Sequence, residues 1–365
     1  MPTTTPTSRR SARRASSKSS SSPPEDGLAT EGHATDPQAT DEPATGRLVA
    51  VGGGTGLAVV LRGLKHRVGE GSLRQLTAVV TVTDDGGSSG RLRRDFGVLP
   101  PGDIRNCIVA LADDEDLLAR LFQYRFPTGD GLSGHSFGNL FLTALTGITG
   151  DFYQAILTAE SILSVRGRIL PATLTDVRLR GWGCSGQVYE GEVAVGHSGE
   201  RLETLELDPS APAAFTPAAR ALREADLIAL GPGSLYTSIL PNLLIPGIRE
   251  AIRDSPARVV LLLNLMTQPG ETDDMSALDH LQAIERHAGE GLVDAVVVHD
   301  GELPPRRLRE YAQTGAHPVS VEEEEIEARG VQVLPRDLLA EGPLLRHDPD
   351  KLSRAVLELM ERANR

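Results

Sequence analysis

Short apolar runs alternate along the chain with stretches in which apolar residues recur every three or four positions. Residues 48–51 form such a run, and Leu57, Leu61 and Leu64 follow a glycine-rich turn at helical spacing. This order predicts a strand, a turn and a helix. Further continuous runs, typical of parallel strands covered on both faces, lie at 76–82, 226–230, 259–263 and 294–298. We therefore predict an α/β fold, a Rossmann-like, mostly parallel sheet with helices on both faces.

The pattern changes between residues 169 and 207. Apolar positions there alternate in short stretches separated by glycine-rich turns, for example at Val177 and Leu179 and again at Leu205 and Leu207. Alternation of this kind predicts antiparallel strands with one buried face. We expect a small antiparallel β insertion over about 169–207. Helices are expected at 103–113, 116–126, 136–146, 152–165, 234–240, 246–254, 274–288, 304–314 and 349–363.

Residues 1–46 have a different composition from the rest. They are rich in Ser, Thr, Pro and Ala, and their large apolar side chains are Met1 and Leu28. Such a segment buries too little apolar surface to offset its chain entropy. Arg9-Arg10 imitates a twin-arginine signal, but no apolar segment follows it. We expect a disordered extension over 1–46 without a targeting address, and one nucleotide-binding domain over 47–365.

Charge and composition exclude several classes of protein. The formal net charge of −13 argues against general nucleic-acid binding. No apolar run approaches the roughly 18 residues that a membrane span requires, so we expect no membrane span. Two cysteines among 365 residues exclude a disulfide scaffold and favour a cytoplasmic location. A nucleophile elbow, a Walker lysine and an H-E-x-x-H motif are missing from the sequence, which leaves hydrolase, P-loop and zincin chemistry unsupported.

The first candidate ligand-binding segment is the glycine-rich turn after the first strand. Missing side chains let a phosphate approach the backbone, and the following helix offers N–H groups and the positive end of its dipole. The third glycine of the dinucleotide-binding motif is replaced by Leu57, so a mere tight turn is an equal alternative. The candidate residues are Gly52, Gly53, Gly54, Thr55 and Gly56.

A second turn of this type follows the strand at 226–230. It holds Gly231, Gly233, Ser234 and Thr237, and Asn264 ends the next strand. The alternative for Ser234 is that it only caps the helix that follows. Because ligands of open α/β sheets bind beyond the carboxyl ends of the strands, these segments should meet at one crevice. Two such turns favour a ligand with several phosphates, or with a phosphate and a sugar.

The loop after the second strand carries two carboxylates within a run of turn-forming residues. Asp84 and Asp85 are candidates for binding a ribose hydroxyl or Mg²⁺, and the alternative is an ordinary turn. We expect this loop to continue to residue 102. The candidate residues that follow the carboxylates are Gly86, Gly87, Ser88 and Ser89.

Arginine and polar residues further along add candidates for phosphate recognition. Arginine is suited to bidentate contacts with phosphate, although such residues are also common surface charges. We expect Asp103 to cap the helix that it opens. The candidate residues are Arg91, Arg105, Asn106, His135 and Asn139, and a lone histidine such as His135 is more often structural.

Together these segments resemble the bacterial gluconeogenesis factor family, a branch of the CofD-like superfamily that also contains the phospholactate transferase. The matching segments are residues 51–57, 83–93, 101–106, 122–126, 132–139, 231–242 and 264–273. The resemblance implies a cytoplasmic regulator needed for cell shape and for growth on gluconeogenic carbon sources. It also implies binding of a nucleotide-diphosphate ligand, notably a UDP-sugar. The resemblance implies no established catalytic activity and no required cofactor. An NAD-like ligand and Mg²⁺ are further candidates for binding.

The alternative branch is a transferase that moves phospholactate from a guanosine diphosphate donor to a flavin-like acceptor with Mg²⁺. Residues 231–238 read Gly-Pro-Gly-Ser-Leu-Tyr-Thr-Ser, whereas transferases typically have a Gly-Pro-Ser-Asn type of turn there. We therefore favour the regulator and assign no catalytic residue. A nicotinamide-dependent oxidoreductase is a third interpretation, supported by fold analogy alone. The protein could also form a homodimer and bind unidentified protein partners in cell-wall or morphogenesis control, and the sequence leaves both possibilities open.

Overall fold

The computed structural model describes residues 46–70, 72–113 and 116–363. The chain divides into two units, Met1–Asp41 and Glu42–Arg365, and every described residue belongs to the second. The expected disordered extension over 1–46 therefore lies outside the described residues, except for Gly46.

The second unit is built on a seven-stranded sheet in the order β10-β9-β8-β7-β1-β2-β3. Every neighbouring pair in it is parallel, which confirms the predicted α/β fold. The order reverses between β1 and β7, so the two turns that follow these strands lie side by side at the carboxyl edge. The strands are β1 (Arg47–Gly52), β2 (Gln75–Val80), β3 (Arg168–Pro171), β7 (Leu227–Leu230), β8 (Arg258–Leu262), β9 (Ala295–His299) and β10 (Gln332–Arg336).

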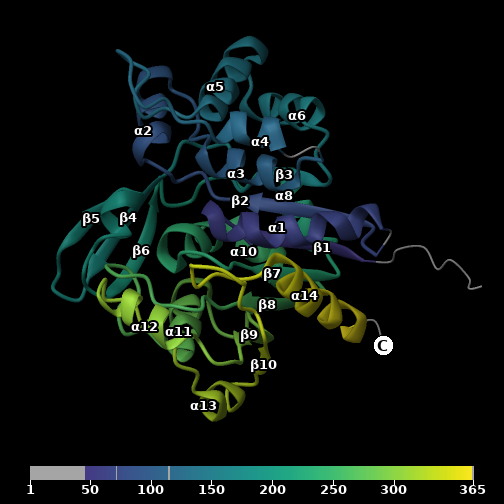
Figure 1. Ribbon diagram of the computed structural model, residues 1–365, viewed down its shortest axis with the longest axis vertical. Helices are drawn as coiled ribbons and strands as arrows, with labels where there is room; N and C mark the ends of the chain where they lie inside the picture. Colours follow the sequence, from purple (N-terminus) through teal and green to yellow (C-terminus); the bar gives the residue numbers. More distant parts are fainter. Residues whose placement is uncertain (1–45, 71, 114–115, 364–365) are drawn as a thin grey trace, which may run out of the picture. The chain divides into compact units, whose positions relative to one another are not determined.

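Helices cover both faces of the sheet, each over its own hydrophobic cluster. On one face Leu48, Ala50 and Ala78 belong to one buried cluster with side chains of helices whose ribbons are labelled in Figure 1. These helices are α1 (Gly54–Gly69), α3 (Gly102–Leu111), α6 (Phe152–Ile162) and α14 (Pro349–Ala363).

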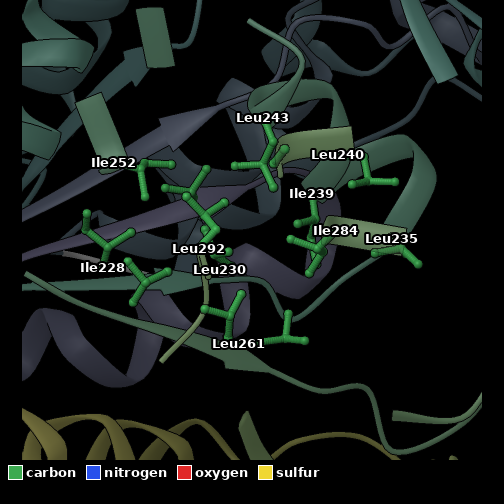
Figure 2. Packing of buried hydrophobic residues seen from close by; sticks show 14 of the residues in the cluster. Ile228, Leu230, Leu235, Ile239, Leu240, Leu243, Ile252, Leu261, Ile284 and Leu292 are labelled. Atoms are coloured by element: carbon green, nitrogen blue, oxygen red, sulfur yellow. The ribbon is translucent and has the colours of Figure 1, made fainter. Parts of the chain in front are cut away.

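On the other face Ile228, Leu230 and Leu261 pack against Ile239 and Ile284 (Figure 2). Strand residues therefore point alternately into the two clusters, which explains why their runs are continuously apolar. The covering elements are α8 (Thr216–Arg223), the π-helical turn η1 (Leu235–Ile239), α9 (Leu240–Leu243), α10 (Pro246–Arg253) and α11 (Ala277–Ala288).

The loop expected up to residue 102 is interrupted by a helix, α2 (Gly87–Phe96). Its first turn consists of Gly and Ser, which usually mark a loop. Ser88 and Ser89 are nevertheless buried, because small side chains let this helix lie close to its neighbours. The other helices are α4 (Asp116–Gln123), α5 (Phe137–Thr149), α12 (Pro305–Ala312) and α13 (Glu323–Glu327).

The β insertion is smaller than expected. Its antiparallel sheet has the order β5-β4-β6, formed by β4 (Arg178–Gly183), β5 (Val188–Glu190) and β6 (Leu202–Asp208). Residues 169–171, expected within it, belong to β3 at the edge of the parallel sheet, where both faces are buried. Residues 192–195, also expected to alternate as a strand, form the short helix α7 (Glu192–Val195).

A membrane-span test of the described residues finds no single helix that is long and apolar enough to cross a bilayer. Helices α5 and α6, between which the chain bends by 120°, are together long and apolar enough to cross a bilayer by length and composition only.

Candidate functional site

A cavity of about 840 Å³ lies beyond the carboxyl ends of the central strands. Its wall includes the turns that follow β1 and β7, together with residues after β2 and β8. This is the place where open parallel sheets bind ligands. The expected candidates that line it are Gly53, Gly54, Thr55, Gly56, Asp84, Gly86, Gly233, Ser234, Thr237 and Asn264.

The remaining candidates lie outside the lining of this cavity. Gly52 and Gly231 sit one position further back, where each turn leaves its strand. The others belong to α2, α3, α5 and the segments that precede them: Asp85, Gly87, Ser88, Ser89, Arg91, Arg105, Asn106, His135 and Asn139.

The start of α1 is open toward the cavity. Gly53 is the N-cap residue and contributes no side-chain hydrogen bond, and Gly54 has a positive φ of 62°. Asp103 does not cap α3 as expected; its carboxylate instead accepts a hydrogen bond from the Gly54 N–H. Burial raises the pKa of Asp103 to about 7, and the nearby Asp84 carboxylate adds to the shift. At the N-terminal end of α1, the carboxylate of Asp103 thus takes up the N–H of Gly54, and no side chain of the N-cap residue covers the other backbone N–H groups.

The two glycine turns touch each other backbone to backbone. A Cβ on Gly56 would lie 2.3 Å from the Pro232 carbonyl oxygen and 2.8 Å from Gly233 Cα. Such a contact is impossible without a backbone shift, so Gly56 provides the close approach that the missing third motif glycine would otherwise supply. Sequence reasoning had assigned Gly56 to the ligand; the structure also gives it a packing role.

Asn264 holds the second turn together. Its Oδ1 accepts a hydrogen bond from Gly233 N at 3.0 Å, and its Nδ2 donates to Gly233 O at 2.8 Å. Nδ2 also lies 3.2 Å from Gln268 Oε1. Most of the bonding capacity of this amide is therefore used within the protein. Its role as a direct ligand contact stays a prediction.

Glu271, which sequence reasoning did not single out, occupies the start of η1. Its carboxylate accepts hydrogen bonds from Tyr236 N at 2.8 Å and from the Thr237 N–H. Capping of this helix was the alternative role for Ser234, but Ser234 makes no capping bond and donates its hydroxyl proton to Glu271. Burial raises the pKa of Glu271, and these donors oppose the rise. Glu271 as a whole residue is only 5% exposed, and it lines the cavity.

Asp84 and Glu192 are further acids that line the cavity. Asp84 Oδ1 accepts a hydrogen bond from Gly86 N at 2.9 Å, whereas Asp85 Oδ1 accepts from Val193 N at 3.1 Å. Of this pair only Asp84 lines the cavity; Asp85 holds the start of α7. Glu192 of α7 also lines it, and burial together with the Asp84 carboxylate raises the pKa of Glu192 well above its usual range.

No group of three or more His, Cys, Asp or Glu side chains among the described residues has an arrangement that could hold a metal ion. The predicted Mg²⁺ site at Asp84 and Asp85 therefore stays a prediction. A carboxylate such as Asp84 fits a magnesium ion that takes its other ligands from water and from a phosphate.

A buried polar network contains four of the candidates outside the lining of the cavity. Ser88 Oγ lies 2.9 Å from His135 Nδ1, and Asn139 Nδ2 donates to Ser89 Oγ at 3.3 Å. Burial, followed by the charge of Arg91, lowers the pKa of His135. These bonds join the starts of α2 and α5, which supports the structural alternative for His135.

Arginines and asparagine near this network also have protein partners. Arg105 Nη2 donates to Asn106 Oδ1 at 2.8 Å, and Arg91 Nη2 donates to the Ser133 carbonyl at 2.8 Å. Arg105 is 9% exposed. These contacts fix the side chains beside the cavity, and ligand contacts by them stay a prediction.

The far wall of the cavity comes from the C-terminal part of the chain, where sequence reasoning found no candidates. Tyr311, Arg346 and His347 line it. Leu345 N donates to Tyr311 Oη at 3.2 Å, which ties the segment carrying Arg346 to α12. Burial lowers the pKa of His347 to about 4, so this imidazole is neutral at neutral pH. No local motif marks these residues, because only the fold brings them to the cavity.

Comparisons with known proteins agree with this architecture. A family model described as "2-phospho-L-lactate transferase CofD" matches residues 48–339. The chain is 47% identical over 312 residues to the "Gluconeogenesis factor" of Halalkalibacterium halodurans, covering 85% of this chain and 95% of that one. It is 44% identical over 316 residues to the protein of the same name from Bacillus subtilis, covering 86% and 98%. A crystal structure of a Bacillus halodurans protein matches with a TM-score of 0.81 and 46% identity, covering 86% of this chain and 99% of that one.

Proposed function

The chain belongs to the CofD family and is related within it to the gluconeogenesis factors, and from this membership we propose that it is a regulator that binds a nucleotide diphosphate, notably a UDP-sugar. The observation that carries the proposal is the cavity at the switch point of the parallel sheet, with the open start of α1 in its wall. Helix starts of this kind bind phosphate through backbone N–H groups and the helix dipole.

The charges around the cavity support a role for Mg²⁺ in this binding. Asp84, Glu192 and Glu271 line the wall, and Arg346 is the only Arg or Lys among the described lining residues. A diphosphate entering this wall meets more acidic than basic side chains. We propose that Asp84 holds Mg²⁺ against the diphosphate, where the ion would neutralise the phosphate charge.

Isothermal titration calorimetry of the full chain tests the proposal. We expect binding of UDP-glucose, weaker binding of GDP and NAD, and a gain in affinity when Mg²⁺ is added. The substitution Gly54→Val should abolish binding, because a β-branched side chain at the start of α1 would occupy the space of a phosphate.

Gly150→Val is the matched control. Gly150 also has a positive φ, 71°, and it ends α5 away from the cavity. A Cβ at Gly150 would meet no heavy atom within 4 Å. Both variants carry the same kind of backbone strain, so only Gly54→Val should lose the ligand. Equal affinities in the two folded variants would contradict the proposal.

The alternative function is a transferase, and the family description favours testing it. Purified wild-type protein should be incubated with a guanosine-diphosphate-linked phospholactate donor, a deazaflavin acceptor and Mg²⁺. We expect no product. Multiple-turnover product formation that depends on Mg²⁺ would replace the regulator with an enzyme.

In the cell we propose a cytoplasmic location and a requirement for normal shape and for growth on gluconeogenic carbon sources. Association into a homodimer and contact with partners in cell-wall or morphogenesis control belong to the same proposal. A deletion strain complemented by the wild type but not by Gly54→Val, at equal protein levels, would link ligand binding to these phenotypes.

A further inference from the structure

The two glycine turns of the cavity differ in how many of their backbone N–H groups a carboxylate occupies: two at the second turn and one at the first. At the start of η1 the N–H groups of Tyr236 and Thr237 donate to the Glu271 carboxylate. At the start of α1 the N-cap residue Gly53 contributes no side chain, and Asp103 takes the Gly54 N–H. A phosphate approaching the second turn would have to compete with a buried carboxylate for its donors.

The hydroxyl groups beside Glu271 form a hydrogen-bonded chain with one direction. Ser234 Oγ donates to Glu271 and lies 2.5 Å from its Oε2. Ser234 Oγ also lies 2.5 Å from Thr237 Oγ1. A hydroxyl carries one proton, and that of Ser234 is used by Glu271, so Thr237 donates to Ser234. Thr237 Oγ1 therefore keeps its lone pairs and is an acceptor, in a residue that lines the cavity.

The negative charge of the Glu271 carboxylate agrees with this direction of the hydrogen bonds. Glu271 is buried at the acceptor end of this chain of hydrogen bonds. Its carboxylate accepts the proton of Ser234, and Ser234 in turn accepts the proton of Thr237. A wall that offers acceptors next to a carboxylate binds hydroxyl donors and repels phosphate. The first turn and Arg346 provide the donors for phosphate on other parts of the wall.

We propose that the second glycine turn binds a ring hydroxyl of the ligand through Thr237 Oγ1, with Ser234 and Glu271 as positioning residues. This inference deepens the proposed function and rests on it. The ligand would place its diphosphate at the start of α1 and a hydroxyl-bearing ring at the start of η1. The ring is either the hexose of a sugar nucleotide or its ribose, which share this chemistry.

Four probes measured by calorimetry separate these possibilities: UDP-glucose, UDP, 2′-deoxy-UDP and inorganic pyrophosphate. Thr237→Val should weaken UDP-glucose binding about three- to tenfold, the scale of one lost hydrogen bond, and leave pyrophosphate binding unchanged. If the hydroxyl belongs to the hexose, UDP binding is also unchanged. If it belongs to the ribose, UDP weakens equally and 2′-deoxy-UDP does not.

Glu271→Gln gives a readout that a merely structural role would not produce. Its amide oxygen can still accept from the backbone N–H groups, while the negative charge is removed. Pyrophosphate should therefore bind more tightly and UDP-glucose less tightly, whereas simple damage to the turn would weaken both. Thr237→Ser, which keeps the hydroxyl, should bind as the wild type does.

Thr146→Val, which removes a hydroxyl bonded to the Leu142 carbonyl on α5, is the control for the loss of a partly buried threonine hydroxyl. It should leave all four affinities unchanged. Wild-type protein that binds no nucleotide overturns the proposed function together with this inference. If the wild type binds UDP-glucose, an unchanged UDP-glucose affinity or a lost pyrophosphate affinity in Thr237→Val overturns this inference alone.

Discussion

Three glycines offer a quantitative test of how closely the two turns of the cavity are packed. A methyl group on Gly56 would lie 2.3 Å from the Pro232 carbonyl oxygen, which belongs to backbone and cannot rotate away. On Gly54 it would meet Ser238 Oγ at 3.8 Å, but the backbone has a positive φ of 62°. On Gly147, in the last turn of α5, it would meet nothing within 4 Å.

These geometries predict a rank order for the Ala variants. Overpacking against backbone costs about 1–3 kcal/mol, so Gly56→Ala should lower the free energy of unfolding by at least the upper part of that range. Gly54→Ala should cost about 1–2 kcal/mol, the penalty of a left-handed conformation with a Cβ. Gly147→Ala should stabilise by about 0.5–1 kcal/mol, because Ala is favoured over Gly within a helix.

Urea unfolding followed by circular dichroism, with the slope m checked for each variant, measures this order. Thermal unfolding should shift by about 2–4 °C for each kcal/mol, as in domains of 150–250 residues, or somewhat less in this larger domain. Gly56→Ala with wild-type stability would refute the close backbone contact between the turns. Gly54→Ala less stable than Gly56→Ala would show that backbone strain outweighs the contact.

Two further changes test the electrostatics of the protein. Glu160 Oε1 accepts from Ile169 N at 2.7 Å, and burial raises the pKa of Glu160 from 4.5 to about 7. Between these pH values the folded state therefore binds more protons than the unfolded state. The free energy of unfolding of the wild type, relative to that of Glu160→Gln, should fall as the pH rises from about 4.5 through 7. A difference between the urea midpoints of the two proteins that stays constant at pH 5, 6 and 8 would disprove this. Asp84→Asn should weaken nucleotide binding by about 1–3 kcal/mol and reduce its dependence on Mg²⁺. Asp85→Asn should have the smaller effect, because the Asp85 carboxylate bonds to Val193 N and does not line the cavity; calorimetry that finds the reverse order would assign the metal to Asp85.

The sequence predicted the parallel sheet and the first glycine turn because both depend on local patterns. Continuous apolar runs identified the central strands, and the glycine turn after β1 marked the start of α1. The edge strand β3 was assigned to the insertion because it is only four residues long and is followed by alternating segments. The helix α2 was hidden by Gly and Ser at its start, whose burial depends on tertiary packing.

The candidate site was predictable only where it lies on the turns after strands. Glu271 lies seven residues after Asn264 and reaches the start of η1 through a loop whose course no periodicity reveals. Glu192 sits on a helix within the insertion, and the structure alone brings it to Asp84. The buried network around His135 was identified from its polar residues, but its partners Ser88 and Ser89 could not be paired with it from sequence spacing.

The wall of the cavity draws on the chain from Gly53 to His347, and this span has a consequence for synthesis on the ribosome. The glycine turn proposed to bind phosphate is made first among the lining segments, and the segment with Arg346 is made last among them. A nascent chain therefore could not gain stability from the complete set of contacts to the proposed ligand until the segment with Arg346 has left the exit tunnel. Stabilisation by the proposed ligand would therefore require that residues 345–347 have been made, and products truncated before residue 346 would lack that stabilisation even when their sheet has formed.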